Sequence, residues 1–173
     1  MKKLRDTKTL TVAAMLTAVG IVLGFFKIPI TQLIEIRFGS LPIALAGMLF
    51  GPGVGGVVGA LVDIGGYLVK PTGPFFPGFT VSSTITGIIF GVLLYNKKFT
   101  LSRVAVAQAV NTLIVGILMN SYWLNMLYFQ NGFWATILAR LPKELITLPI
   151  NIALTYVTFK ALEKVRNRGL IFG

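Results

Sequence analysis

Long apolar stretches, separated by short polar breaks, make up most of the chain. We expect helices at about residues 8–27, 38–50, 53–70, 79–96, 101–121 and 134–162. A helix that crosses a bilayer needs roughly 20 largely apolar residues, and every stretch except the second approaches that length. The pattern predicts an all-α integral membrane protein, a single domain over residues 1–173 built as a bundle of six transmembrane helices.

The second stretch leaves the number of crossings open. Residues 38–50 are short for a crossing, and the turn Gly51-Pro52-Gly53 separates them from the third stretch. Residues 38–70 could instead form one broken, re-entrant unit, which is tolerated in a membrane where it is buried within protein. Five crossings are therefore an alternative to six.

The composition excludes most catalytic classes. Apolar residues make up 55% of the chain and charged residues only 12%, about half of the roughly 25% that is typical of soluble domains. There is no Cys, no His and no phosphate-binding Gly-x-x-x-x-Gly-Lys motif, which removes thiolate, imidazole and common zinc chemistry and ATP hydrolysis by this chain alone. We expect no enzyme activity, no catalytic residue, no metal and no cofactor.

The basic residues flank the apolar stretches. The net charge is +11, but cations at helix ends are typical of a protein in a lipid bilayer, so we expect no nucleic-acid partner. With six crossings and a cytoplasmic N-terminus, eleven basic residues lie inside and five lie outside or in the outer half of the membrane. The outer five are Lys27, Arg37, Lys70, Arg140 and Lys143. The positive-inside rule then favours cytoplasmic N- and C-termini.

Small residues recur four positions apart in several stretches. The pairs are Ala14 and Ala18, Gly20 and Gly24, Gly55 and Gly59, and Gly87 and Gly91. In lipid, such pairs let helix backbones approach closely. We interpret them as packing contacts inside the bundle, with the pair on the first helix as a partial exception.

Asp63, Tyr67 and Lys70 form the first candidate set for ligand binding. Spacings of four and three place them near one helical face, with Lys70 roughly 10 Å nearer the outer surface than Asp63. A carboxylate at membrane depth is costly and needs a partner or a cavity. Asp63 is therefore either a ligand-binding group or a structural one that pairs with Arg140 or Lys143.

The second set consists of Arg140, Lys143, Glu144, Thr147 and Asn151. Their spacings of three and four again align them, in a stretch where Pro142 and Pro149 should loosen the backbone hydrogen bonding of the helix. They either bind a ligand or form an internal ion-pair network that fixes this helix, and both roles can hold together.

A third set lies in two outer connections, residues 70–79 and residues 120–125 with the aromatic residues that follow them. Its members are Phe75, Phe76, Pro77, Tyr122 and Trp123, with Arg37 of the first outer loop. Single aromatic residues at a membrane interface usually face lipid, but a stiff, Pro-rich aromatic loop suits a wall or lid over a flat ligand. Together the three sets favour a site that opens outward, for an elongated ligand with a flat polar heterocycle at one end and carboxylates at the other.

Four motifs carry a family resemblance. They are the run Thr9-Leu10-Thr11-Val12-Ala13-Ala14-Met15-Leu16-Thr17-Ala18 after the basic N-terminus, Phe38-Gly39-Ser40-Leu41-Pro42, Leu49-Phe50-Gly51-Pro52, and Gly73-Pro74-Phe75-Phe76-Pro77-Gly78-Phe79-Thr80. Over essentially its whole length, the chain resembles the substrate-binding (S) components of energy-coupling factor (ECF) vitamin transporters. Within that superfamily it is most similar to the folate subfamily.

This resemblance implies a six-helix protein of the bacterial plasma membrane that binds extracellular folate with high affinity. It also implies partners for uptake, namely a membrane coupling subunit and two cytoplasmic ATPase subunits, with Ala14 and Ala18 at the docking surface. A pterin would suit Asp63 and the aromatic residues, and the glutamate carboxylates of folate would suit the cationic rim.

Two alternatives stay open at this point. The first is an S component for another ligand, such as riboflavin, pantothenate or a queuosine precursor, although an uncharged ligand would not need a cationic rim. The second is a self-sufficient secondary transporter, which would need more membrane carboxylates for ion coupling than Asp63 and Glu144.

Overall fold

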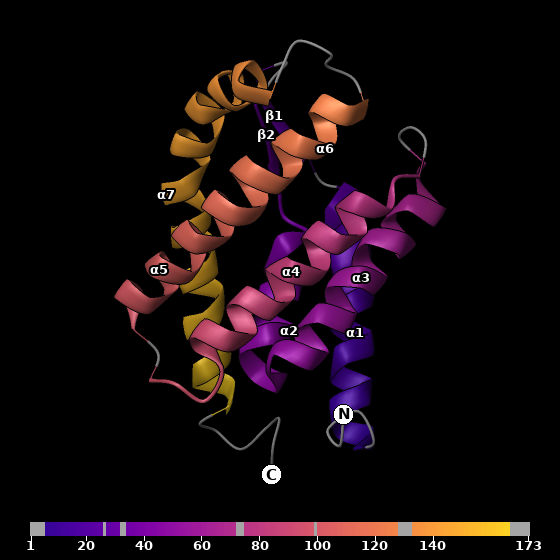
Figure 1. Cartoon of the computed structure of the whole chain (residues 1–173). Helices are drawn as coiled ribbons and strands as arrows, with labels where there is room; N and C mark the ends of the chain where they lie inside the picture. Colours follow the sequence, from indigo (N-terminus) through magenta and orange to yellow (C-terminus); the bar gives the residue numbers. More distant parts are fainter. Residues whose placement is uncertain are drawn as a thin grey trace.

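The computed structural model describes residues 6–25, 27–31, 34–71, 75–98, 100–127 and 133–166, with the backbone alone described for 27–31, 34–37, 139 and 163–166. In chain order the elements are α1 (Thr7–Phe25), β1 (Lys27–Thr31), β2 (Ile34–Arg37), α2 (Ser40–Phe50), α3 (Pro52–Val69), α4 (Pro77–Leu94), α5 (Leu101–Asn111), the π-helix η2 (Thr112–Met119), α6 (Asn120–Leu127) and α7 (Phe133–Arg166) (Figure 1).

The helices run alternately up and down the bundle. The start of α1 and the end of α7 lie at one end, here called the terminal end, and β1 and β2 lie at the opposite end, the hairpin end (Figure 1). Among the described residues, five helical segments are long and apolar enough to cross a membrane, and the shorter apolar helix Ser40–Phe50 joins them. The prediction of a helical membrane bundle is confirmed.

Residues 27–37 differ from the prediction, which carried the first helix to residue 27. α1 ends at Phe25, and β1 and β2 then form an antiparallel hairpin that pairs Lys27 with Arg37 and Ile28 with Ile36. Branched residues such as Ile28, Ile34 and Ile36 favour extended backbone. The hairpin is too short to change the class of the fold, and it lies at the end of the bundle opposite the start of α1 (Figure 1).

A second difference concerns residues 120–125, which the sequence analysis placed in an outer loop. They are helical, because α5, η2 and α6 form one continuous segment over Leu101–Leu127. The chain has no Pro and no Gly between Gly116 and Gly132 to end the helix. Side chains expected in a loop therefore lie on the faces of a helix.

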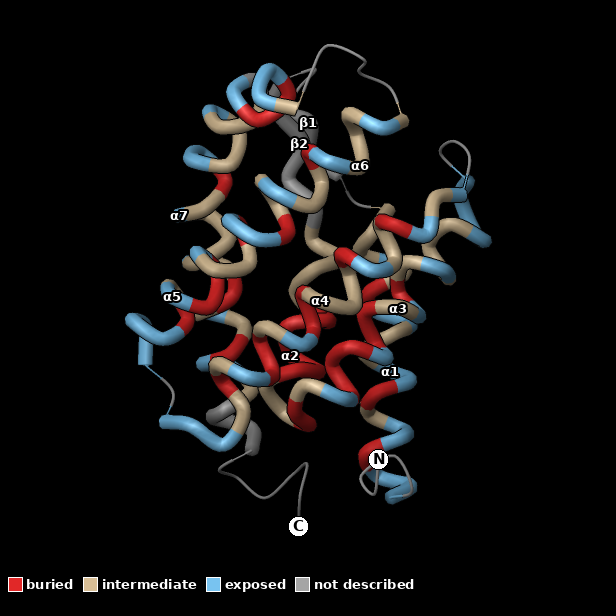
Figure 2. Tube along the Cα trace, in the orientation of Figure 1, coloured by how far each residue is buried: buried red, intermediate tan, exposed pale blue. Residues whose placement is uncertain are grey.

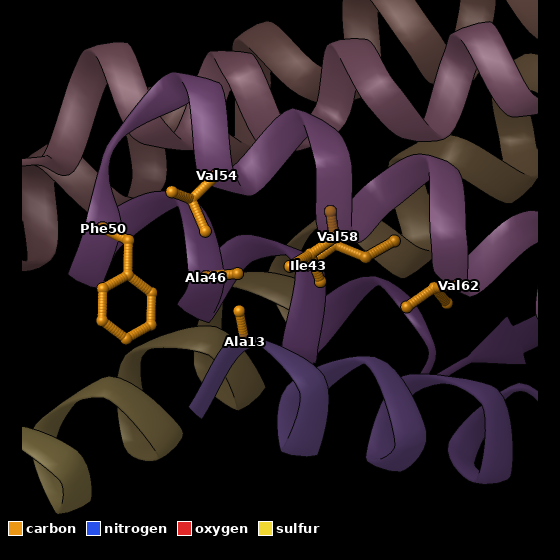
Figure 3. Packing of buried hydrophobic residues seen from close by; sticks show 7 residues of the cluster. All are labelled: Ala13, Ile43, Ala46, Phe50, Val54, Val58 and Val62. Atoms are coloured by element: carbon orange, nitrogen blue, oxygen red, sulfur yellow. The ribbon is translucent and has the colours of Figure 1, made fainter. Parts of the chain in front are cut away.

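Most buried residues lie in the half of the bundle near the terminal end (Figure 2). One cluster there joins α1, α2 and α3 through Ala13, Ile43, Ala46, Phe50, Val54, Val58 and Val62 (Figure 3). A second cluster joins α2, α4, α5 and α7 around Phe90 and Phe159, each at most 1% exposed. This half is a packed apolar core.

Glycines bring α2, α3 and α4 into backbone contact. A Cβ atom at Gly55 of α3 would lie 2.6 Å from the Gly47 Cα atom of α2 and 2.6 Å from the Gly87 carbonyl oxygen of α4. A Cβ atom at Gly59 would overlap the Ser83 carbonyl, and one at Gly87 would overlap the Gly55 carbonyl. The interpretation of these spaced glycines as internal packing contacts is confirmed.

Gly87→Ala should lower the free energy of unfolding by roughly 1–3 kcal/mol, because the added methyl group must push two backbones apart. Gly66→Ala on α3 is the matched control, since nothing lies within 4 Å of its added Cβ atom. Thermal unfolding of both variants in one detergent measures the difference. Equal melting temperatures for the two variants would contradict the close helix crossing.

Candidate ligand-binding site

Asp63 and Tyr67 lie half-buried on α3, near its end at Val69. The Thr80 hydroxyl of α4 donates a hydrogen bond to Asp63 Oδ2 over 2.7 Å. The Tyr67 ring contacts the Phe75 ring, with 5.1 Å between centroids, while Lys70 follows the helix and is exposed. The first predicted set therefore lies along α3, with its carboxylate held at the α3–α4 interface.

An aromatic cluster joins the start of α4 to α6. The Phe76 ring lies 5.4 Å from the Trp123 ring, and the Trp123 ring lies 5.1 Å from the Tyr122 ring, both edge-on. The Trp123 indole N–H donates a hydrogen bond to Ser82 Oγ over 3.1 Å. Because Ser82 is buried on α4, this bond holds the indole ring against α4. Two segments that the sequence analysis placed in separate outer connections thus meet through Phe76 and Trp123.

Gly78 allows this meeting. A Cβ atom at Gly78 would lie 2.6 Å from Trp123 Cδ2 and would overlap the Phe76 ring. Pro77 begins α4, where its missing N–H is harmless. Pro77, Phe75 and Tyr122 are exposed, the last two by 46% and 54%. The cluster therefore has a packed side at Trp123 and an open side at Tyr122 and Phe75.

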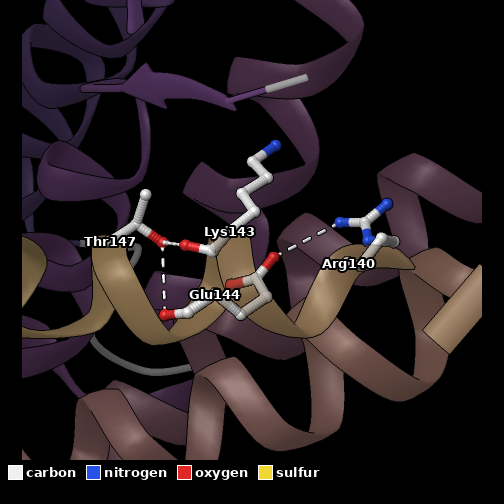
Figure 4. Close-up of polar contacts among 4 residues, drawn as sticks. All are labelled: Arg140, Lys143, Glu144 and Thr147. Atoms are coloured by element: carbon white, nitrogen blue, oxygen red, sulfur yellow. Dashed lines mark hydrogen bonds and ion pairs between the residues drawn. The ribbon is translucent and has the colours of Figure 1, made fainter. Parts of the chain in front are cut away.

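Arg140 and Glu144 form an ion pair on α7. Arg140 Nη2 lies 3.4 Å from Glu144 Oε1, and the two side chains are 17% and 13% exposed. Lys143 extends from the same helix beside this pair, and its carbonyl accepts the Thr147 hydroxyl over 2.9 Å (Figure 4). The interpretation of this set as an internal ion-pair network holds for Arg140 and Glu144, and their role toward a ligand stays a prediction.

Gly116 of η2 makes room for the Glu144 carboxylate. An ideal Cβ atom at Gly116 would lie 2.9 Å from Glu144 Oε2, so the carboxylate rests against the backbone of η2. Single π-helical turns within α-helices are frequent at functional sites. The ion pair therefore lies between α7 and the continuous segment α5–η2–α6.

Five polar atoms are buried and find no hydrogen-bond partner within the described part of the chain. They are Asn111 Oδ1, Asn120 Oδ1, Ser121 Oγ, Asn125 Oδ1 and Arg140 Nε. The sequence analysis placed Asn120, Ser121 and Asn125 in an outer connection and selected only Tyr122 and Trp123 from it as site residues. The sequence feature that could have indicated Asn120, Ser121 and Asn125 is the presence of three polar residues in a stretch without Pro or Gly, where a membrane helix can continue.

α4 separates the predicted residues into two groups. Thr80 and Ser82 are two residues apart and therefore point to nearly opposite sides of α4. Thr80 holds Asp63 on one side, and Ser82 holds Trp123 on the other. The side chain of Arg37 in β2 lies outside the described residues.

A shallow depression of about 270 Å³ lies far from both groups, where α4 ends and α5 begins. It is lined by Leu93, Lys97, Ser102, Arg103 and Val106.

The family comparison decides the identity of this bundle. The family model described as ECF transporter, substrate-specific component, matches residues 8–159. The chain belongs to this family. The family is one of multi-pass membrane proteins, in agreement with the five long apolar helices.

Curated relatives of this ECF substrate-specific component are named folate transporter FolT. One from Clostridium novyi is 38% identical over 135 residues, 78% of each chain. Another from Leuconostoc mesenteroides is 31% identical over 156 residues, 87% of this chain and 84% of the relative. The resemblance to the folate subfamily is thereby confirmed.

Two solved structures share the fold of this ECF component. A crystal structure of FolT bound with folic acid matches with a TM-score of 0.78 and 34% identity, over 87% of this chain and 92% of that one. The S component of a bacterial ECF transporter matches with a TM-score of 0.70 and 25% identity, over 91% and 96% of the two chains.

Glu144→Gln should destabilise the protein by roughly 1–3 kcal/mol, because it leaves the Arg140 guanidinium charged and unpaired in a largely buried position. The double variant Arg140→Gln/Glu144→Gln should be no less stable than this single variant, since it removes both charges. Thermal unfolding without ligand measures both. If the stability loss of the double variant equals the sum of the losses from Arg140→Gln and Glu144→Gln alone, the ion pair has no role in stability.

Proposed function

We propose that this chain binds extracellular folate and delivers it to an ATP-driven ECF module in the bacterial plasma membrane. The observation that carries the proposal is the match to FolT bound with folic acid, at 34% identity over 87% of this chain. The relatives named folate transporter FolT support the same ligand.

The geometry at the hairpin end suits this ligand. The edge-on rings of Phe76, Tyr122 and Trp123 offer apolar walls for flat aromatic rings. Among the outer cations, Lys70 is exposed and Lys143 is half-buried, and they and Arg37 are candidates for the glutamate carboxylates. The remaining predicted residues, including Asp63, Tyr67 and Glu144, stay candidates for contact with the ligand.

Energy for uptake would come from partners. We assign ATP hydrolysis to two cytoplasmic ATPase subunits, which would act through a membrane coupling subunit. The start of α1 and the end of α7 share one end of the bundle (Figure 1). Lys97 and Lys98 lie in the connection at that end, and Arg103 lies near the start of α5. The positive-inside rule supports a cytoplasmic location for the terminal end, so the candidate site would face outward.

Folate should bind the purified protein, whereas riboflavin and pantothenate should neither bind comparably nor displace it. Isothermal titration calorimetry measures the binding. Fluorescence provides a second readout, because the chain has only two Trp residues and one of them, Trp123, lies in the aromatic cluster. A flavin spectrum of the ligand released from purified protein, or no heat on titration with folate, would overturn the assignment.

The exposed face of α1 is the proposed docking surface for the coupling subunit. Thr9, Ala13 and Gly20 are the buried residues of α1, whereas Ala14 and Ala18 are exposed. Met15, at 63%, is an exposed apolar residue on the same helix. Small residues on an apolar helix face allow close approach by a second helix in lipid.

Ala14→Trp and Ala18→Trp should abolish folate uptake in proteoliposomes that contain the coupling subunit and both ATPase subunits, while folate binding stays unchanged. The bulky rings would hold the partner helix away from α1. Val92→Trp is the control, because Val92 is 55% exposed on α4, away from α1. Wild-type uptake rates in both α1 variants would exclude this face as the docking surface.

A further inference from the structure

The depression of about 270 Å³ lies at the terminal end of the bundle, where α4 ends and α5 begins (Figure 1). Two of its lining residues are apolar, Leu93 and Val106, and the other three are Lys97, Ser102 and Arg103. Leu93 is half-buried and the other four are exposed, Val106 by 54%. The depression therefore opens on the outer surface of the bundle, where a membrane protein contacts lipid.

Apolar and cationic side chains lie at different depths in this depression. α4 runs toward the terminal end and α5 runs away from it (Figure 1). Leu93 lies in the last turn of α4, before the connection that contains Lys97. On α5, Val106 lies three residues beyond Arg103 and so roughly 4.5 Å nearer the middle of the bundle. From the middle outward the order is apolar and then cationic, which matches the order of acyl chain and phosphate in a phospholipid.

The cations beside the depression have no counter-charge nearby in the sequence. They are Lys97, Lys98 and Arg103, and no Asp or Glu occurs between residues 64 and 143. None of the three forms a salt bridge within the described part of the chain. Basic groups at the end of a membrane helix are attracted to anionic lipids at the bilayer surface. The charge of this surface therefore favours an anionic ligand.

The lining also presents hydrogen-bond donors for a phosphate. Arg103 Nη1 donates to the Lys98 carbonyl over 3.2 Å, which holds the guanidinium beside the connection. Thr100 precedes α5 and makes no side-chain capping hydrogen bond, so its hydroxyl leaves the first N–H groups of the helix uncovered. Phosphate oxygens accept hydrogen bonds from such N–H groups, and also from the Lys97 ammonium, the Ser102 hydroxyl and the guanidinium. Positive charge and donors thus lie together at the outer rim of the depression.

We propose that this depression binds one anionic phospholipid, with its phosphate at Lys97, Ser102 and Arg103 and an acyl chain along Leu93 and Val106. Basic pockets between transmembrane helices are typical sites for anionic lipid head groups. A free phosphate ion would use the cations but would leave the apolar part of the lining without a partner, which favours a lipid. The bound lipid would hold the α4–α5 connection at the membrane surface. This site is separate from the proposed folate site and does not depend on it.

Native mass spectrometry of the full-length protein in detergent, with added phosphatidylglycerol, tests this proposal. The wild-type protein should bind one phosphatidylglycerol more tightly than it binds phosphatidylcholine, whose head group has no net charge. Lys97→Ala and Arg103→Gln should each weaken phosphatidylglycerol binding roughly fivefold, the effect of one basic residue near an anionic lipid. Lys98→Ala is the matched control, because it removes the same charge from the next residue, which is exposed but does not line the depression. It should leave the affinity unchanged.

Equal weakening by Lys97→Ala and Lys98→Ala, or equal affinity for the two lipids, would overturn the proposal, because either result indicates diffuse attraction to the surface. Displacement of phosphatidylglycerol by inorganic phosphate would overturn it in favour of a site for a free anion. Wild-type lipid affinity in both Lys97→Ala and Arg103→Gln would also overturn it. Weaker assembly of those variants with the coupling subunit would then assign the surface to a protein partner.

Folate titration of each variant is the folding control. All three variants should bind folate with wild-type affinity, because the depression lies far from Phe76 and Trp123 of the aromatic cluster. Wild-type protein that binds phosphatidylglycerol as expected but binds no folate would contradict the proposed function and leave the lipid site supported.

Discussion

Backbone contact between α2, α3 and α4 is the constraint on which the rest of the bundle depends. Gly47, Gly55 and Gly87 meet where a single added Cβ atom would lie 2.6 Å or less from a neighbouring backbone. In lipid the hydrophobic effect does not drive helices together, so close packing of backbones must contribute much of the stability. These glycines let three helices pack as one solid unit near the terminal end.

The half of the bundle near the terminal end is a packed apolar core, and the polar residues of the candidate site lie in the other half. Phe90 and Phe159 fill the core near the terminal end, whereas Asp63, Trp123, Arg140 and Glu144 belong to the region toward the hairpin end. Groups that are costly at membrane depth are therefore gathered where a ligand could satisfy them. The packed unit supplies the rigidity that a binding site of few polar contacts requires.

How far the sequence predicts the site differs from residue to residue. The spacing of Arg140 and Glu144 indicated their ion pair, because residues four apart are neighbours on any helix. The contact between Phe76 and Trp123 could not be predicted, since it joins residues 47 positions apart. It depends on the rotation of α4 and α6 about their axes, which local sequence does not specify. Asn120, Ser121 and Asn125 of α6 were not selected because the sequence analysis assigned residues 120–125 to an outer connection. Local sequence did not show that the helical segment beginning at Leu101 continues to Leu127.

The sequence by itself determined the membrane class, the approximate helices, the basic terminal end and the family resemblance. These follow from hydropathy, charge and short motifs, which are local properties of the chain. Only the tertiary structure decided that Asp63 lies against Thr80 on one side of α4, while Ser82 and Trp123 lie on the other. It also decided which buried polar atoms lack a hydrogen-bond partner among the residues that the structure describes. Pairing depends on the rotation of each helix about its axis and on the register between helices, and hydropathy specifies neither.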